Sequence, residues 1–140
     1  KHPQFRAVRG DAMQFPFATA SFETVMAISV IEHIGIGHYG DRLAEDGDRA
    51  TVAEIARVLR PGGRALITVP FGLSMIDGVQ RVYDSQRLRE LLSPLGIVKL
   101  EFARSRDGLW APCTESEAAS VDWMGVSRAV ALVVLTTPSR

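Results

Sequence analysis

The sequence predicts an α/β fold, in which crossover helices connect the strands of one sheet and an antiparallel strand pair closes its C-terminal end. Short apolar runs of strand length alternate with segments whose apolar residues recur at helical spacing. A Pro-Gly-Gly turn at residues 61–63 separates the longest helical segment from the next strand. The chain has 140 residues, of which 46% are hydrophobic and 23% charged, so we expect one globular domain over residues 1–140.

The first predicted elements are two strands and a loop. Residues 5–9 alternate apolar and polar side chains and end at a Gly-Asp turn, which predicts a short strand. Residues 24–28 form a nearly continuous apolar run, which is typical of a strand buried on both faces. A glycine-rich, charged loop follows over residues 35–48.

The next segment predicts a helix and a strand. Thr51 and Glu54 have the spacing of a capping box, and apolar residues recur at helical spacing over residues 52–59. The Pro-Gly-Gly turn ends this helix, and residues 64–69 predict the following strand.

A second helix and two strands complete the chain. Asp84 can cap the helix, whose leucines over residues 88–92 share one face. Residues 97–102 and 128–135 predict an antiparallel strand pair, whereas residues 107–124 have no clear pattern. Ligands on such sheets bind beyond the carboxyl ends of the strands, so the residues that follow each strand are the candidate site.

Composition excludes several classes of function. Lys plus Arg and Asp plus Glu both number 16, and this zero net charge removes the main electrostatic reason to expect nucleic-acid or membrane partners. Cys113 is the only cysteine, so no intrachain disulfide can form, and a cytoplasmic location fits best. The acidic residues 41–48 lack the EF-hand pattern, so we expect no metal site.

Three motifs follow one another along the chain: residues 10–25, Ile31-Glu32-His33 and residues 54–63. In this order and at this spacing they resemble the "GDA–LPF–SFD–V", "LEH" and "E–RVLKPGG" motifs of class I S-adenosylmethionine-dependent methyltransferases of the type 11 kind. Residues 34–41, 69–72 and 81–88 also resemble poorly characterised methyltransferase-like proteins of glycan gene clusters. The resemblance implies a Rossmann-like sheet and S-adenosylmethionine as the cofactor.

The resemblance assigns cofactor contacts to two segments. The Asp11 carboxylate would accept a hydrogen bond from the adenine amino group, the Ala12 amide would meet a ring nitrogen, and Met13 would flank the adenine. Ser29 and Val30 would lie near the methionine portion.

The sequence departs from the family at its N-terminal end. The family's first strand, its glycine-rich turn and its ribose-binding acid have no counterpart here, so we expect an N-terminally truncated domain that is inactive alone. In the family's strand order, a strand at residues 5–9 would lie roughly 14 Å from its remaining neighbours. The missing strands could come from another chain segment, the strand could re-pair, or two fragments could complement each other.

Four side chains are candidates for chemistry at the site. The resemblance makes Glu32 and His33 the candidate catalytic pair, since an imidazole can take a proton from a substrate hydroxyl near neutral pH. The alternative for His33 is packing at a helix start. His38 and Tyr39 are candidate substrate contacts in a loop that could equally be only solvated.

Arg81 and Tyr83 are candidate substrate contacts of a different kind, because an arginine with an aromatic ring suits a phosphate or a sugar. Their alternative is a surface pair.

The function we expect is methyl transfer to a small-molecule or glycan-precursor acceptor, by alignment of the acceptor with the sulfonium methyl. The alternative is a non-catalytic methyltransferase-like module for binding or assembly. A nicotinamide-dependent dehydrogenase fits poorly, because its phosphate-binding loop has no counterpart here. An exposed sheet edge would offer a surface for homo-oligomers.

Overall fold

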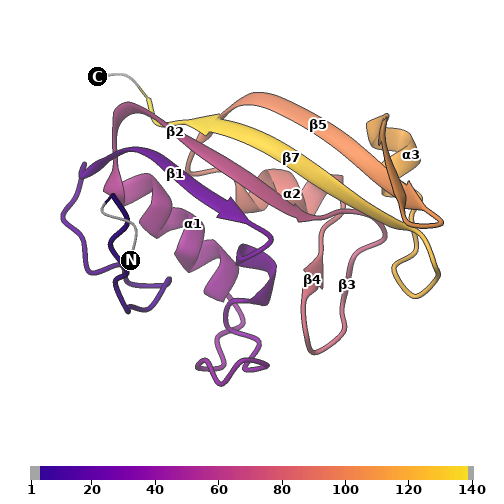
Figure 1. Ribbon diagram of the computed structural model, residues 1–140, viewed down its shortest axis with the longest axis horizontal. Coiled ribbons are helices and arrows are strands. Elements are labelled where there is room, and N and C mark those ends of the chain that lie inside the picture. The colour runs from indigo at the N-terminus through magenta and orange to yellow at the C-terminus, as the bar shows by residue number, and fades with distance from the viewer. Residues whose placement is uncertain (1–3, 139–140) are drawn as a thin grey trace.

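The computed structural model describes residues 4–138 and contains one five-stranded sheet with a small two-stranded sheet beside it (Figure 1). The large sheet has the strand order β1-β2-β7-β5-β6, and the small one pairs β3 with β4. The elements are β1 (Phe22–Ile28), the 3-10 helix η1 (Ile31–His33), α1 (Gly47–Val58), β2 (Leu59–Pro70), β3 (Met75–Ile76), β4 (Arg81–Val82), α2 (Ser85–Leu91), β5 (Gly96–Arg106), β6 (Leu109–Cys113), α3 (Glu115–Ala119) and β7 (Arg128–Thr136). None of the helices within residues 4–138 is long and apolar enough to cross a lipid bilayer.

The strand directions confirm the predicted fold class. β1 and β2 run parallel and are joined by the crossover helix α1, whereas β7 runs antiparallel to both β2 and β5. The predicted antiparallel pair at the C-terminal end is therefore β5 with β7, and β6 extends it as a hairpin. The Pro-Gly-Gly turn lies in the irregular part of the β1–β2 register, between the pairs Phe22–Leu59 and Thr24–Arg64.

One face of the sheet carries the core. α1 and α2 lie against this face (Figure 1). The spacing of apolar residues in both helices places their buried side chains toward the strands. The fully buried members of this core include Val52, Ile55, Ile67, Val69, Leu88 and Leu135.

The opposite face of the sheet is open. Met26 and Ile28 of β1 are 65% and 51% exposed, and Leu132 of β7 is 39% exposed. The prediction that residues 24–28 are buried on both faces is therefore wrong. An apolar run indicates that its side chains favour burial, but it does not tell whether one or both faces of the strand are covered. β1 is an edge strand that is covered on one face only.

The prediction of a strand at residues 5–9 is also wrong. Phe5 and Val8 are 72% and 59% exposed in an irregular segment, and among residues 4–138 the nearest bridge is the local one between Asp11 and Gln14. A strand exists through its backbone pairing, and within the described chain no neighbour lies beside this segment to pair with it.

The capping box predicted at Thr51 is wrong, although the helix is correct. α1 begins at Gly47 after Asp46, so Thr51 lies inside it, where its hydroxyl donates to the Gly47 carbonyl at 2.8 Å. A capping box does exist at α3, in the segment left unassigned: the Thr114 hydroxyl accepts the Glu117 amide at 3.2 Å, and the Glu117 carboxylate accepts the Thr114 amide at 2.9 Å. By contrast, Asp84 caps α2 as predicted.

Candidate functional site

The carboxyl end of β1 turns sharply into the candidate site. Ser29 follows the strand with φ +49°, a left-handed conformation that is uncommon for a residue other than glycine. Its amide donates to the carbonyl and the hydroxyl oxygen of Thr68 at 3.2 and 3.0 Å, which ties the turn to the end of β2. Ser29 and Val30 are both exposed, and their contact with the cofactor stays a prediction.

Glu32 is buried in η1 with part of its hydrogen-bonding capacity unused. The residue is 1% exposed, and its Oε2 atom has no hydrogen-bond partner among the described residues. Its Oε1 atom lies 3.8 Å from Nε2 of His33. Burial raises the pKa of the Glu32 carboxyl, although the nearby His33 charge and the Ser29 hydroxyl act in the opposite direction.

Both ring nitrogens of His33 face protein groups. Nδ1 lies 2.7 Å from the carbonyl oxygen of Val79, and because a carbonyl only accepts, Nδ1 carries the hydrogen. Nε2 faces Glu32. His33 therefore fastens the β3–β4 hairpin over η1, and to act as a general base it would use Nε2 on the Glu32 side.

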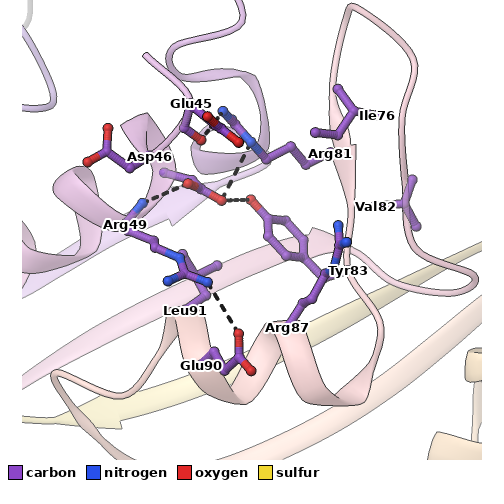
Figure 2. A pocket seen from close by; sticks show the side chains of 11 residues that line it. Glu45, Asp46, Arg49, Ile76, Arg81, Val82, Tyr83, Arg87, Glu90 and Leu91 are labelled. Atoms are coloured by element: carbon purple, nitrogen blue, oxygen red, sulfur yellow. Dashed lines mark hydrogen bonds and ion pairs between the residues drawn. The ribbon is translucent and has the colours of Figure 1, made fainter.

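Arg81 and Tyr83 form a buried cluster with Asp48 (Figure 2). The exposed fractions are 7% for Arg81, 4% for Tyr83 and 6% for Asp48. The Tyr83 hydroxyl donates to Asp48 Oδ2 at 2.8 Å, and Arg81 Nε lies 3.6 Å from the same oxygen. The terminal nitrogens of Arg81 donate to the backbone carbonyls of Ile34, Ala44 and Glu45 at 2.6, 3.4 and 3.2 Å.

This burial shows that the alternative of a surface pair is wrong for Arg81 and Tyr83. Burial and the Asp48 charge together raise the pKa of the Tyr83 hydroxyl well above its ordinary value, so it stays a donor. Arg81 instead connects β4 to the loop between η1 and α1. Substrate binding by Arg81 and Tyr83 stays a prediction.

The loop that joins η1 to α1 is folded rather than merely solvated. Gly35 has φ +80°, and a Cβ atom there would collide with the Ala44 carbonyl, so only glycine fits. The Asp41 carboxylate accepts the Gly35 amide at 2.7 Å. His38 and Tyr39 are exposed, with ring centroids 4.8 Å apart, and they stay predicted substrate contacts.

Asp11 lies on an exposed turn of the N-terminal segment. Its Oδ1 atom accepts the Met13 amide at 2.8 Å, and Ala12 and Met13 are half-buried. Figure 1 shows this segment, in indigo, beside the C-terminal half of α1, whereas β1 ends near the other end of that helix. The contacts of the described residues do not join Asp11 to the Ser29–His33 stretch, so their shared role in cofactor binding stays a prediction.

Sequence reasoning missed the residues that hold the N-terminal segment. The Arg57 guanidinium donates to the carbonyls of Phe15 and Phe17 at 3.1 and 2.9 Å, and Glu54 accepts the Phe15 amide at 2.7 Å. Glu54 and Arg57 also pair with each other at 2.7 Å. Their spacing of three residues on a helix is a visible signal of an ion pair, but neither this spacing nor the family motif indicates that the pair holds the N-terminal segment.

A family model described as "Caenorhabditis protein of unknown function, DUF268" matches residues 11–107, which run from Asp11 through β5. The chain belongs to the DUF268 family. The match includes the β1 turn, η1 and the buried Arg81 cluster of this DUF268 protein.

A curated relative indicates which enzymes resemble the DUF268 chain. The chain is 32% identical over 126 residues to the O-methyltransferase resE of Aspergillus sclerotiorum, covering 80% of this chain and 44% of that protein. The chain therefore spans less than half the length of this relative.

Solved structures show a class I methyltransferase fold. A SAM-dependent methyltransferase of Methanosarcina mazei superposes with TM-score 0.61 and 12% identity over 94% of this chain and 66% of that one. The 1,6-didemethyltoxoflavin-N1-methyltransferase of Burkholderia thailandensis, solved with 1,6-didemethyltoxoflavin and S-adenosylhomocysteine, gives TM-score 0.58 and 15% identity over 91% of this chain and 48% of that one. At these identities the likeness shows the fold alone.

Proposed function

We propose that the protein containing this chain transfers a methyl group from S-adenosylmethionine to a small-molecule or glycan-precursor acceptor. The observation that carries the proposal is the exposed, strained turn at Ser29 and Val30, placed at the carboxyl end of a parallel strand in a class I methyltransferase fold. Kinship with an O-methyltransferase, at 32% identity over 126 residues, supports the same reaction class.

The described residues fit part of the cofactor. Asp11 is exposed and uses Oδ1 for the Met13 amide, which leaves Oδ2 to accept from an exocyclic amine such as that of adenine. Ser29 and Val30 offer exposed backbone at the end of β1. When bound, S-adenosylmethionine supplies a methyl group activated by a sulfonium, so these residues contribute by alignment.

Glu32 and His33 contribute positioning and a proton site. His33 holds the hairpin through Val79, and its Nε2 lies 3.8 Å from Glu32 Oε1, which is an ion-pair distance rather than a hydrogen bond. Should an acceptor hydroxyl approach Nε2, the buried Glu32 would stabilise the imidazolium that forms.

Calorimetric titration of the full-length protein with S-adenosylhomocysteine tests the cofactor proposal. We expect micromolar binding that Asp11→Ala weakens at least about tenfold, since an acceptor for the adenine amine is lost. Asp122→Ala is the matched control, because the Asp122 carboxylate accepts the amide two residues on, that of Met124, at 2.9 Å in the same kind of turn. Absence of binding by the full-length protein, or equal affinities of both variants, would overturn the proposal.

The second candidate is a non-catalytic module that assembles through its sheet. Met26 and Ile28 favour it, because they are exposed on the edge strand β1, which pairs only with β2 among the described residues. Full-length protein that forms a discrete homo-oligomer in light scattering, and fails to bind S-adenosylhomocysteine, would support this candidate over the enzyme.

A further inference from the structure

A cavity lies between the N-terminal turn of α1, α2 and the β3–β4 hairpin (Figure 2). Its volume of about 740 Å³ falls within the range that small-molecule sites occupy. Its lining does not include Ser29–His33, so it is distinct from the β1 turn. The Arg81 guanidinium separates the two regions, because it contributes to the cavity wall and also donates to the carbonyl of Ile34.

Part of the cavity wall is apolar. Val82 and Leu91 are 2% exposed, and the Tyr83 ring lies between them in the lining with its hydroxyl turned to Asp48. Ile76 of β3, by contrast, is 58% exposed at the rim. An apolar or aromatic group of a ligand would contact this wall, and the surface that it would newly bury is mainly that of Ile76.

Most of the charged groups in the lining already have partners in the protein. Asp48 accepts from Tyr83 and lies beside Arg81, whose remaining nitrogens donate to backbone carbonyls. Arg49 and Glu90 pair with each other at 3.2 Å across the gap between α1 and α2. These four groups therefore hold the walls together and need no ligand.

Three charged groups in the lining are left without a partner. The Arg87 guanidinium makes no side-chain hydrogen bond or ion pair within residues 4–138, and the carboxylates of Glu45 and Asp46 are likewise unpaired there. Arg87 comes from α2 and extends toward Tyr83 and Val82 in Figure 2, whereas the two acids come from the turn before α1. The unpaired charge on the α2 wall of the cavity is therefore cationic, and the unpaired charge on the α1 wall is anionic.

We propose that this cavity binds a small zwitterion with an apolar body, such as an aromatic or aliphatic amino acid. Arg87 would take the carboxylate in a bidentate pair, Glu45 and Asp46 would take the ammonium group, and the side chain would cover Tyr83. The lining holds four carboxylates and three guanidinium groups, so an anion alone would meet excess negative charge and a cation alone would meet Arg87. The two charges of a zwitterion complement both walls.

Titration of the full-length protein with three matched probes tests this charge pattern without any methyl donor. The probes are L-phenylalanine, 3-phenylpropanoate, which lacks the ammonium group, and phenethylamine, which lacks the carboxylate. We expect phenylalanine to bind at least about tenfold more tightly than either half, because only phenylalanine meets both walls. Comparable affinities for all three, or no saturable binding of phenylalanine, would overturn the proposal whether or not the protein binds S-adenosylhomocysteine.

Variants assign the two walls separately. Arg87→Gln should weaken the binding of phenylalanine and 3-phenylpropanoate about tenfold and leave the binding of phenethylamine unchanged. The double change of Glu45→Gln with Asp46→Asn should weaken the binding of phenethylamine about tenfold and leave that of 3-phenylpropanoate unchanged. Arg89→Gln is the control, because Arg89 lies on the same helix but pairs with Glu115 outside the cavity at 3.0 Å. An Arg89→Gln effect as large as that of Arg87→Gln would contradict the assignment.

Discussion

Asp48 in the cluster at β4 and Asp11 in the N-terminal turn have the same side chain and use it in opposite ways. Arg81, Tyr83 and Asp48 are each less than 8% exposed, and their polar atoms form hydrogen bonds and ion pairs with one another and with backbone groups. Asp11 is exposed and uses only one carboxylate oxygen. The comparison teaches that unused hydrogen-bonding capacity, rather than residue type, separates a framework residue from a ligand contact.

The difference has an energetic basis. A buried arginine beside a buried aspartate leaves an uncompensated charge when either one is removed, whereas an exposed carboxylate is stabilised by water with or without a protein partner. Substitutions in the two regions should therefore differ strongly in their effect on folding.

The largest effect is expected for Arg81→Met. Removing the guanidinium leaves the buried Asp48 carboxylate with the Tyr83 hydroxyl and the Arg49 amide but no cation beside it, and frees the carbonyls of Ile34 and Glu45. We therefore expect a loss of about 3–5 kcal/mol in the free energy of unfolding. Urea denaturation measures it. Arg87→Met, an exposed position without side-chain partners in the described chain, should change stability by less than about 0.5 kcal/mol. Equal losses for the two variants would remove the distinction between them.

Tyr83→Phe is expected to have an intermediate effect. It deletes only the hydroxyl that donates to Asp48 at 2.8 Å, and leaving that buried acceptor short of one bond should lower the free energy of unfolding by about 1–3 kcal/mol. A double-mutant cycle with Asp48→Asn isolates the pair. Additive losses in that cycle would mean that the two side chains do not interact in solution.

Glu32→Gln should change how the free energy of unfolding depends on pH, which tests whether a buried carboxyl behaves differently from an exposed one. Burial raises the folded-state pKa of Glu32 above 4.5, so the folded protein keeps this proton at a pH where the unfolded chain has lost it. This contribution to stability is complete below pH 4.5 and is lost as pH rises through the folded-state value. Glu32→Gln should therefore flatten the decline in stability above pH 4.5, measured by urea denaturation from pH 4 to 8. A decline of unchanged slope would show that Glu32 is not its source.

The elements that the sequence predicted correctly are those whose signal is local. The leucine face and Asp84 cap of α2 act within one helix, and β2 and β7 are apolar because they lie in the middle of the sheet. The strand at residues 5–9 failed because pairing depends on a neighbour, which periodicity within one segment does not report.

The candidate site shows the same limit. The partners of the Arg81 side chain include carbonyls that lie 47 and 36 residues away along the chain, at Ile34 and Glu45. No local pattern in the sequence encodes such a contact, so the burial of Arg81 emerges only from the fold. The i,i+3 pair of Glu54 and Arg57 was visible, but the backbone groups of Phe15 and Phe17 that it holds were not.

Asp11→Ala is expected to have the smallest effect on folding, which is what makes it informative. The turn loses the bond from the Met13 amide to Asp11 Oδ1, an exposed interaction, so the free energy of unfolding should change by less than about 0.5 kcal/mol. Amide hydrogen exchange should quicken at Met13 while the Phe15 amide, held by Glu54 at 2.7 Å, stays protected. Loss of protection at both amides would mean that the Asp11 turn supports the packing of the N-terminal segment, and Asp11 would then belong with Arg81 among the framework residues.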